Sequence, residues 1–195
     1  MLFRSKLGFL YVTDTVNDRI LRFPPGSTAG TGATMVAGTG VAGAGPSQLN
    51  NPYKAFVDDD LTMYIADADN HRIQRWSYGA CSGVTVAGTG TAGSALNQLN
   101  TPASVVVDSN GFMYISDFGN HRILRWSVGA CVGECIAACS GASGTAANQL
   151  NNPFSLAFDS NGLLYVSDKL NNRVQQFPLF SSSSKCRSLF CEQAA

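Results

Sequence analysis

Hydrophobic and β-branched residues occur along this chain in short runs separated by turn residues, without the spacing of an amphipathic helix. Two runs split by a turn follow each of three prolines, as AFVDDDLTMYIAD, SVVVDSNGFMYISD and SLAFDSNGLLYVSD. Asp-Ser-Asn-Gly at 108–111 and 159–162 supplies a hairpin turn, because Asn and Gly tolerate positive φ. A third run (RILRF, RIQRW) follows, and a fourth lies around 35–37 and 85–87. The pattern predicts four short strands per unit.

The unit is repeated. One fourteen-residue segment occurs four times, as LYVTDTVNDRILRF, MYIADADNHRIQRW, MYISDFGNHRILRW and LYVSDKLNNRVQQF. Its aspartates are Asp14, Asp67, Asp117 and Asp168, spaced by 53, 50 and 51 residues. A second block, Gln-Leu-Asn-(Asn or Thr)-Pro, precedes three of the copies. Four strands per unit of about fifty residues, without helical periodicity, are typical of a β-propeller blade.

The recurring pattern Tyr-(Val/Ile)-x-Asp-x-x-Asn-(His/x)-Arg-(Ile/Val) resembles the NHL repeat. The sequences at 70–73 and 120–123 match it most closely, whereas Asp18 and Asn172 replace the preferred His or Arg. The resemblance covers nearly the whole chain. It implies an all-β fold, a β-propeller of four-stranded antiparallel blades. Propellers of this family usually have six blades, and protein binding is their commonest role.

The repeat spacing predicts one propeller domain at 1–180, with blades at about 1–37, 52–88, 102–138 and 153–191. A Ser-rich stretch and Cys-containing tail at 181–195 could form a degraded last strand. Three arrangements remain open: part of a larger propeller, a closed ring of four blades, or an open array completed by self-association.

Charge narrows the choice of partners. The 13 basic residues balance 13 acidic ones, so the chain lacks the excess of positive charge that is typical of nucleic-acid binding. RNA binding, known for some NHL propellers, is therefore kept only as an alternative. No apolar run approaches the ~20 residues that cross a bilayer. The N-terminus lacks a cleavable signal pattern, while six cysteines favour an extracellular setting, so the compartment stays open.

Two glycine-rich segments, 38–43 and 88–93, match Gly-x-Gly-x-x-Gly. A dinucleotide site requires such a loop to open a helix, whereas here a strand follows. The motif recurs once per repeat, and we expect its third copy to lose the first glycine to Cys139. These segments are interpreted as connections between blades, so no nucleotide or other cofactor is expected.

Each repeated aspartate has an arginine five residues later, and this uniformity favours a structural ion pair over a catalytic set. His71 and His121 occupy equivalent positions on separate blades, too far apart to share a metal. A lyase-type NHL relative would need several histidines and a metal. We therefore expect no catalytic residues and no metal site. The predicted structural signature comprises Asp14, Arg19, Asp67, Arg72, Asp117, Arg122, Asp168 and Arg173.

The remaining features are also interpreted as structural. Trp76 and Trp126 recur at one position per blade and predict packing between blades. Cys131 and Cys135 flank a short Val-Gly-Glu segment and are the predicted disulfide. The sequence thus predicts a non-enzymatic scaffold that binds a protein or peptide through the loops connecting its blades.

Overall fold

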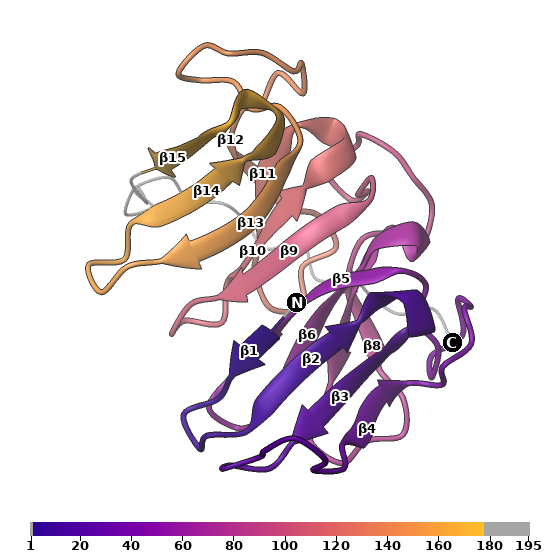
Figure 1. Ribbon diagram of the computed structural model, residues 1–195. Helices are drawn as coiled ribbons and strands as arrows, with labels where there is room; N and C mark the ends of the chain where they lie inside the picture. The colour runs from indigo at the N-terminus through magenta and orange to yellow at the C-terminus, as the bar shows by residue number, and fades with distance from the viewer. Residues whose placement is uncertain (1, 178–195) are drawn as a thin grey trace.

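The computed structural model describes residues 2–177, which form four antiparallel sheets placed side by side (Figure 1). Each sheet is one blade, and its strands follow one another in chain order. Blade 1 comprises β1 Leu2–Arg4, β2 Leu10–Asp14, β3 Arg19–Phe23 and β4 Thr34–Gly38; blade 2 comprises β5 Pro52–Val57, β6 Met63–Asp67, β7 Arg72–Trp76 and β8 Val84–Ala87; blade 3 comprises β9 Pro102–Val107, β10 Met113–Asp117, β11 Arg122–Trp126 and β12 Glu134–Ala137; blade 4 comprises β13 Pro153–Phe158, β14 Leu164–Asp168 and β15 Arg173–Phe177.

The strands of the β-propeller fold are those that the sequence predicts. The fourth strand of blade 4 and the tail at 181–195, with Cys186 and Cys191, lie outside the described residues. Residues 2–177 thus form four blades, whereas propellers of the NHL family usually have six.

A short 3₁₀ turn, which the strand pattern does not predict, joins the second and third strands of every blade. The residue that ends each turn has φ between 49° and 54°. Asp, Asn and His tolerate this left-handed region better than other non-glycine residues, which explains the residue types at this position. The turns are η1 Thr15–Asn17, η2 Ala68–Asn70, η3 Phe118–Asn120 and η4 Lys169–Asn171, and the residues that end them are Asp18, His71, His121 and Asn172.

The hydrophobic core consists of three clusters, one between each pair of successive blades. Ile20 of blade 1 packs in one cluster with Ile65 and Trp76 of blade 2. Trp126 of blade 3 occupies the same position in the cluster between blades 2 and 3. Both indoles are buried between blades, as their recurrence predicts. A third cluster joins blades 3 and 4.

None of these clusters joins blade 4 to blade 1. The face of blade 4 directed away from blade 3 is uncovered in the described part of the chain, because Val174 is 67% exposed. The equivalent residues Ile20, Ile73 and Ile123 are fully buried by the following blade. The blades therefore bury each other in sequence, and the last lacks a neighbour on one side within residues 2–177.

The backbone takes a left-handed conformation, which favours glycine, where the fourth strand ends beside the third. Gly38 lies opposite Arg19 with φ 80°, and a Cβ atom there would meet the Asp18 carbonyl. In the third copy Ala138, with φ 54°, holds this position. The expectation that Cys139 replaces the glycine was wrong by one residue, because Ala137 pairs with Ile123 as Ala37 pairs with Ile20.

Candidate functional site

The aspartate and arginine of each repeat meet across the hairpin between the second and third strands, as Asp67 and Arg72 do in register. In blade 2, Arg72 Nε donates to Asp67 Oδ2 at 2.7 Å, and Asn70 Nδ2 donates to the same oxygen at 2.9 Å. The other carboxylate oxygen accepts the backbone N–H of Asn50 at 2.7 Å. We call this Asp–Asn–Arg set the clamp of a blade. Equivalent pairs form between Asp14 and Arg19, Asp117 and Arg122, and Asp168 and Arg173.

The clamp holds the loop that arrives from the preceding blade. Arg72 donates through Nη1 to the Ala44 carbonyl at 2.8 Å and through Nη2 to the Gly45 carbonyl at 3.1 Å. Asn70 donates to the Gly43 carbonyl at 2.8 Å. The glycine-rich segment is thus a connection that leads into strand β5, as the sequence predicts. The Ala44 and Gly45 carbonyls that follow it are bound by a charged donor, which forms stronger hydrogen bonds than a neutral one.

Blades 3 and 4 repeat this arrangement, whereas blade 1 does not. Arg122 reaches the Ser94 carbonyl at 2.7 Å, and Arg173 reaches the Thr145 carbonyl at 2.6 Å. In blade 1, Arg19 bonds Asp14 at 2.8 Å and reaches no loop carbonyl within the described residues. The clamp of blade 1 is also the most exposed of the four.

This difference in burial changes the electrostatics of an identical motif. Burial raises the pKa of Asp67 and Asp117, although three hydrogen bonds to each carboxylate oppose the shift. Hydrogen bonds from Arg19 and Asn17 lower the pKa of the exposed Asp14 carboxyl. For Asp168, burial acts to raise the pKa but is outweighed by its hydrogen bonds, so the pKa is lowered.

The two histidines bind the backbone of the next blade. His71 Nδ1 accepts the backbone N–H of Thr101, and His121 Nδ1 accepts that of Asn152, each at 3.1 Å. Asp18 performs the same task in blade 1, where its carboxylate accepts the N–H of Asn51 at 2.7 Å. The replacement of His by Asp therefore preserves the contact between blades.

The clamps, the 3₁₀ turns and the joining loops 39–51, 88–101 and 138–152 lie at the same end of every blade. We call this the joining-loop end. The inner strands β5, β9 and β13 also begin here, because Pro52, Pro102 and Pro153 lie opposite the clamp aspartates. The three loops contain no charged residue. They present an uncharged surface that includes the exposed side chains of Val41 and Leu96, and the clamp arginines hold these loops in place.

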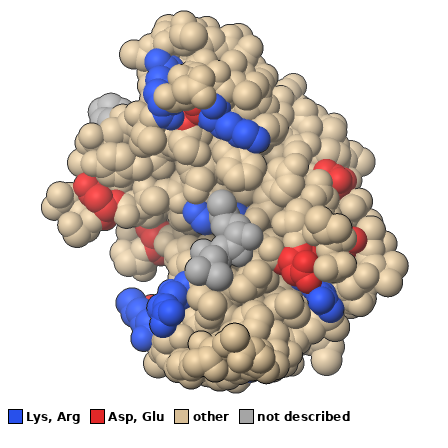
Figure 2. All heavy atoms as spheres, in the orientation of Figure 1, with Lys and Arg blue, Asp and Glu red and all other residues tan. Residues whose placement is uncertain are grey.

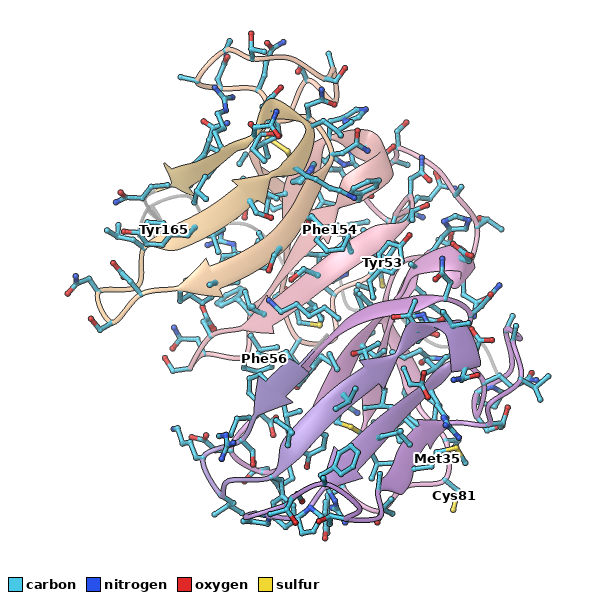
Figure 3. The ribbon with its side chains drawn as sticks, in the orientation of Figure 1. Met35, Tyr53, Phe56, Cys81, Phe154 and Tyr165 are labelled. Carbon is cyan, nitrogen blue, oxygen red and sulfur yellow. A yellow bond between two sulfur atoms is a disulfide. The ribbon has the colours of Figure 1, made fainter. Side chains whose placement is uncertain are left out.

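An aromatic cluster lies at the joining-loop end, built by three different blades. Tyr53 of β5 packs on Phe154 of β13, with ring centroids 5.7 Å apart, and the two side chains lie toward one another in Figure 3. Phe118 of η3 meets Phe154 edge-on at 6.1 Å. The Lys169 ammonium lies 4.8 Å from the Phe154 ring centroid and 5.7 Å from that of Phe118. All three rings remain partly exposed.

Lys54, next to Tyr53, links blade 2 to blade 4. Its ammonium donates to Ser155 Oγ at 3.1 Å and to the Leu156 carbonyl at 2.9 Å. Burial lowers the pKa of this amine. Sequence reasoning missed both Lys54 and the aromatic cluster. One feature of the sequence could have indicated the cluster. An aromatic residue follows Pro52 and Pro153, whereas Ala103 stands at the equivalent position after Pro102.

The predicted disulfide between Cys131 and Cys135 is not formed. Cys135 instead bonds Cys139, with Cα atoms 5.6 Å apart. Cys135 lies in β12 opposite Leu124, and the left-handed conformation of Ala138 turns the chain back after the strand, which brings Cys139 within reach. Among the described residues, Cys81 is an exposed free thiol.

Charged groups are sparse on the face shown in Figure 2, where small blue and red groups are separated by uncharged surface. Within residues 2–177, no three His, Cys, Asp or Glu side chains are grouped to hold a metal ion. No helix in that range is long and apolar enough to span a membrane.

Comparison with known proteins supports the repeat assignment. The NHL repeat family matches residues 99–126 and 150–177. No curated protein matches the sequence. Among solved structures, the chain is similar to an auxiliary nutrient binding protein from Bacteroides thetaiotaomicron, with 15% identity and a TM-score of 0.64 over 88% of this chain and 45% of that chain.

Two enzymes have a similar fold. A gluconolactonase from Xanthomonas campestris has 17% identity and a TM-score of 0.64, over 90% of this chain and 56% of that chain. A catalytically inactive virginiamycin B lyase from Staphylococcus aureus has 12% identity and a TM-score of 0.56, over 93% and 55%. This chain spans about half the length of these proteins. At such identities the likeness shows the fold alone. The third and fourth repeats thus match the NHL repeat, and the first and second copies have the same strands and clamp, on a β-propeller fold.

Proposed function

We propose that this chain is a non-enzymatic binding module that holds a protein or peptide segment against its joining-loop end. The observation that carries the proposal is the partly exposed aromatic cluster of Tyr53, Phe118 and Phe154, set beside uncharged loops. Aromatic side chains at the centre of an interface supply most of the binding energy in many complexes. The Lys169 ammonium above two of the rings adds a donor for a peptide carbonyl.

A non-enzymatic role is supported by how the repeated polar residues are used. The clamp carboxylates and guanidiniums are occupied in holding the joining loops. The histidine Nδ1 atoms accept backbone N–H groups of the following blade. The repeated aspartates, arginines and histidines of the described blades therefore already have structural partners. Rigid loops on a fixed scaffold favour binding, because less conformational entropy is lost when the ligand arrives.

The uncharged loops also indicate how the ligand is recognised. Because joining loops 39–51, 88–101 and 138–152 lack charge, binding depends on hydrogen bonds and aromatic contacts rather than on ion pairs. We expect affinity to change less than about threefold between low and high salt, in contrast to the steep salt dependence of nucleic-acid binding. A strongly salt-dependent shift with RNA would favour the nucleic-acid alternative instead.

A peptide-display selection tests the proposal. A random peptide library is selected on the wild-type chain, and the recovered peptides are measured against two variants. Phe118→Ser removes one ring of the cluster and is expected to weaken binding about tenfold or more. Phe112→Ser is the matched control, because Phe112 is also partly exposed and lies under a cation, Arg125, but belongs to the opposite turn of blade 3. Equal binding by both variants, or a library that yields no peptide, would refute the proposal.

A further inference from the structure

A groove separate from the joining-loop cluster lies between blades 1 and 2, with a cavity volume of about 400 Å³. It runs between β4 and the turn that joins β7 to β8. Figure 3 shows Met35 and Cys81 side by side there, away from Tyr53 and Phe154. Met35 is 48% exposed and Tyr78 is 59% exposed. The side chains that matter for its chemistry are Tyr11, Arg22, Met35, Trp76, Tyr78 and Cys81.

The groove contains a cation, Arg22, that has no acidic partner among residues 2–177. Arg22 lies opposite Thr34 on the neighbouring strand. The equivalent arginine of blade 3, Arg125, lies opposite Glu134, and the two form an ion pair at 2.6 Å. Arg22 forms no ion pair within residues 2–177. One register position therefore decides whether the arginine is neutralised within its own blade.

Aromatic rings hold this guanidinium in place. Its central carbon lies 5.0 Å from the Phe9 ring centroid and 5.2 Å from that of Tyr78. Stacking on aromatic rings fixes the plane of the guanidinium, and the Tyr11 and Tyr78 hydroxyls lie within hydrogen-bonding range of it. A guanidinium has five N–H donors, so these two contacts leave donors that can bind an anion. A planar guanidinium matches a carboxylate through two parallel hydrogen bonds.

We propose that this groove binds an amphipathic carboxylate, with its acid group on Arg22 and its apolar body against the exposed side chains of Met35 and Tyr78. The volume lies within the range of small-molecule sites. The exposed thioether of Met35 adapts its shape to apolar groups, and Tyr78 offers a ring face. Both the C-terminal residue of a peptide and a free aryl-substituted acid have this chemistry.

The corresponding groove between blades 2 and 3 shows why the first is preferred. Arg75 there lies opposite Val84, so it also lacks a cross-strand acid. Val128 takes the place of Tyr78, and Thr85 takes the place of Met35. That groove therefore has the cation and the buried indole of Trp126 but lacks the tyrosine ring and the thioether, which makes Arg75 a matched control.

Binding is measured by calorimetry with N-acetyl-phenylalanine and with its uncharged amide. The acid is expected to bind at least tenfold more tightly than the amide. A six-residue peptide ending in phenylalanine, as free acid and as amide, distinguishes the two sources of the carboxylate. Tighter binding of the peptide acid than of N-acetyl-phenylalanine identifies a peptide C-terminus, and equal binding identifies a free acid. The acid is also expected to slow alkylation of Cys81, followed by mass spectrometry of its peptide.

Three variants locate the site. Thr34→Glu copies the pair of Glu134 and Arg125, so it should fold and should weaken binding of the acid at least tenfold. Tyr78→Val copies the second groove and should weaken binding severalfold, whereas Arg75→Gln should leave it unchanged. The proposal is overturned if acid and amide bind equally, if Thr34→Glu binds like the wild type, if Arg75→Gln is as weak as Thr34→Glu, or if nothing binds at about 10 mM acid. Because the joining-loop cluster is not altered by these variants, the two sites are tested separately.

Discussion

The same ion pair is expected to contribute very differently to stability in two blades. Arg122 and Arg19 have the same place in the repeat, and each bonds its aspartate at 2.8 Å. The side chains of Arg122 and Asp117 are 8% and 0% exposed, whereas those of Arg19 and Asp14 are 37% and 23% exposed. Substitution of either arginine by methionine removes the charge and keeps most of the aliphatic volume.

The expected cost follows from what each substitution leaves behind. Arg122→Met leaves the Asp117 carboxylate buried without its cation and leaves the Ser94 and Ala95 carbonyls without a charged donor. Removal of one partner from a buried pair costs about 3–5 kcal/mol. Arg19→Met exposes Asp14 to more water and breaks no bond to a loop, so about 0–1 kcal/mol is expected.

Urea unfolding measures this difference. The buried indoles of Trp76 and Trp126 report the loss of packing between blades through their fluorescence. For a urea m-value of about 2 kcal/mol/M, Arg122→Met should lower the midpoint by roughly 1.5–2.5 M, and Arg19→Met by less than about 0.5 M. The double variant Asp117→Asn/Arg122→Met should be more stable than Arg122→Met alone, since it removes the unpaired buried charge.

Equal losses in the two arginine variants would refute the reasoning, because burial and loop contacts would then not determine the value of the pair. If the double variant is no more stable than Arg122→Met, the loss of stability comes from the lost loop contacts and not from the unpaired Asp117 carboxylate.

Two further predictions concern the central lysine and the uncovered face of blade 4. Because burial lowers the pKa of Lys54, the folded chain loses this proton at a lower pH than the unfolded chain does. This group therefore makes stability rise with pH between the lowered pKa and the ordinary lysine pKa of about 10.4. Lys54→Met should flatten that rise in urea midpoints, and an unchanged slope would contradict the assignment. We propose that the face around Val174 associates with another blade surface. Sedimentation should then show self-association of the wild type, and Val174→Lys should reduce it. The control Val16→Lys, at an exposed site on η1, should leave the association unchanged. Equal association in both variants would argue against this face.

Much of the fold could be predicted from the sequence because it depends on interactions between residues that are close along the chain. The strands, their turns and the Asp–Arg pairing depend on residues a few positions apart, such as Asp67 and Arg72 across one hairpin. These contacts repeat because the local pattern repeats. The disulfide was predicted wrongly, because the choice between Cys131 and Cys139 as the partner of Cys135 depends on the left-handed conformation of Ala138.

The sequence by itself thus determined the repeat, the strands of each blade and the pairs that close each hairpin. Only the tertiary structure decided which clamps are buried and hold a loop, because that depends on the preceding blade. It also brought together Tyr53 and Phe154, 101 positions apart. Burial is a property of neighbouring blades, and the side chains at the contacts between blades do not all follow the repeat.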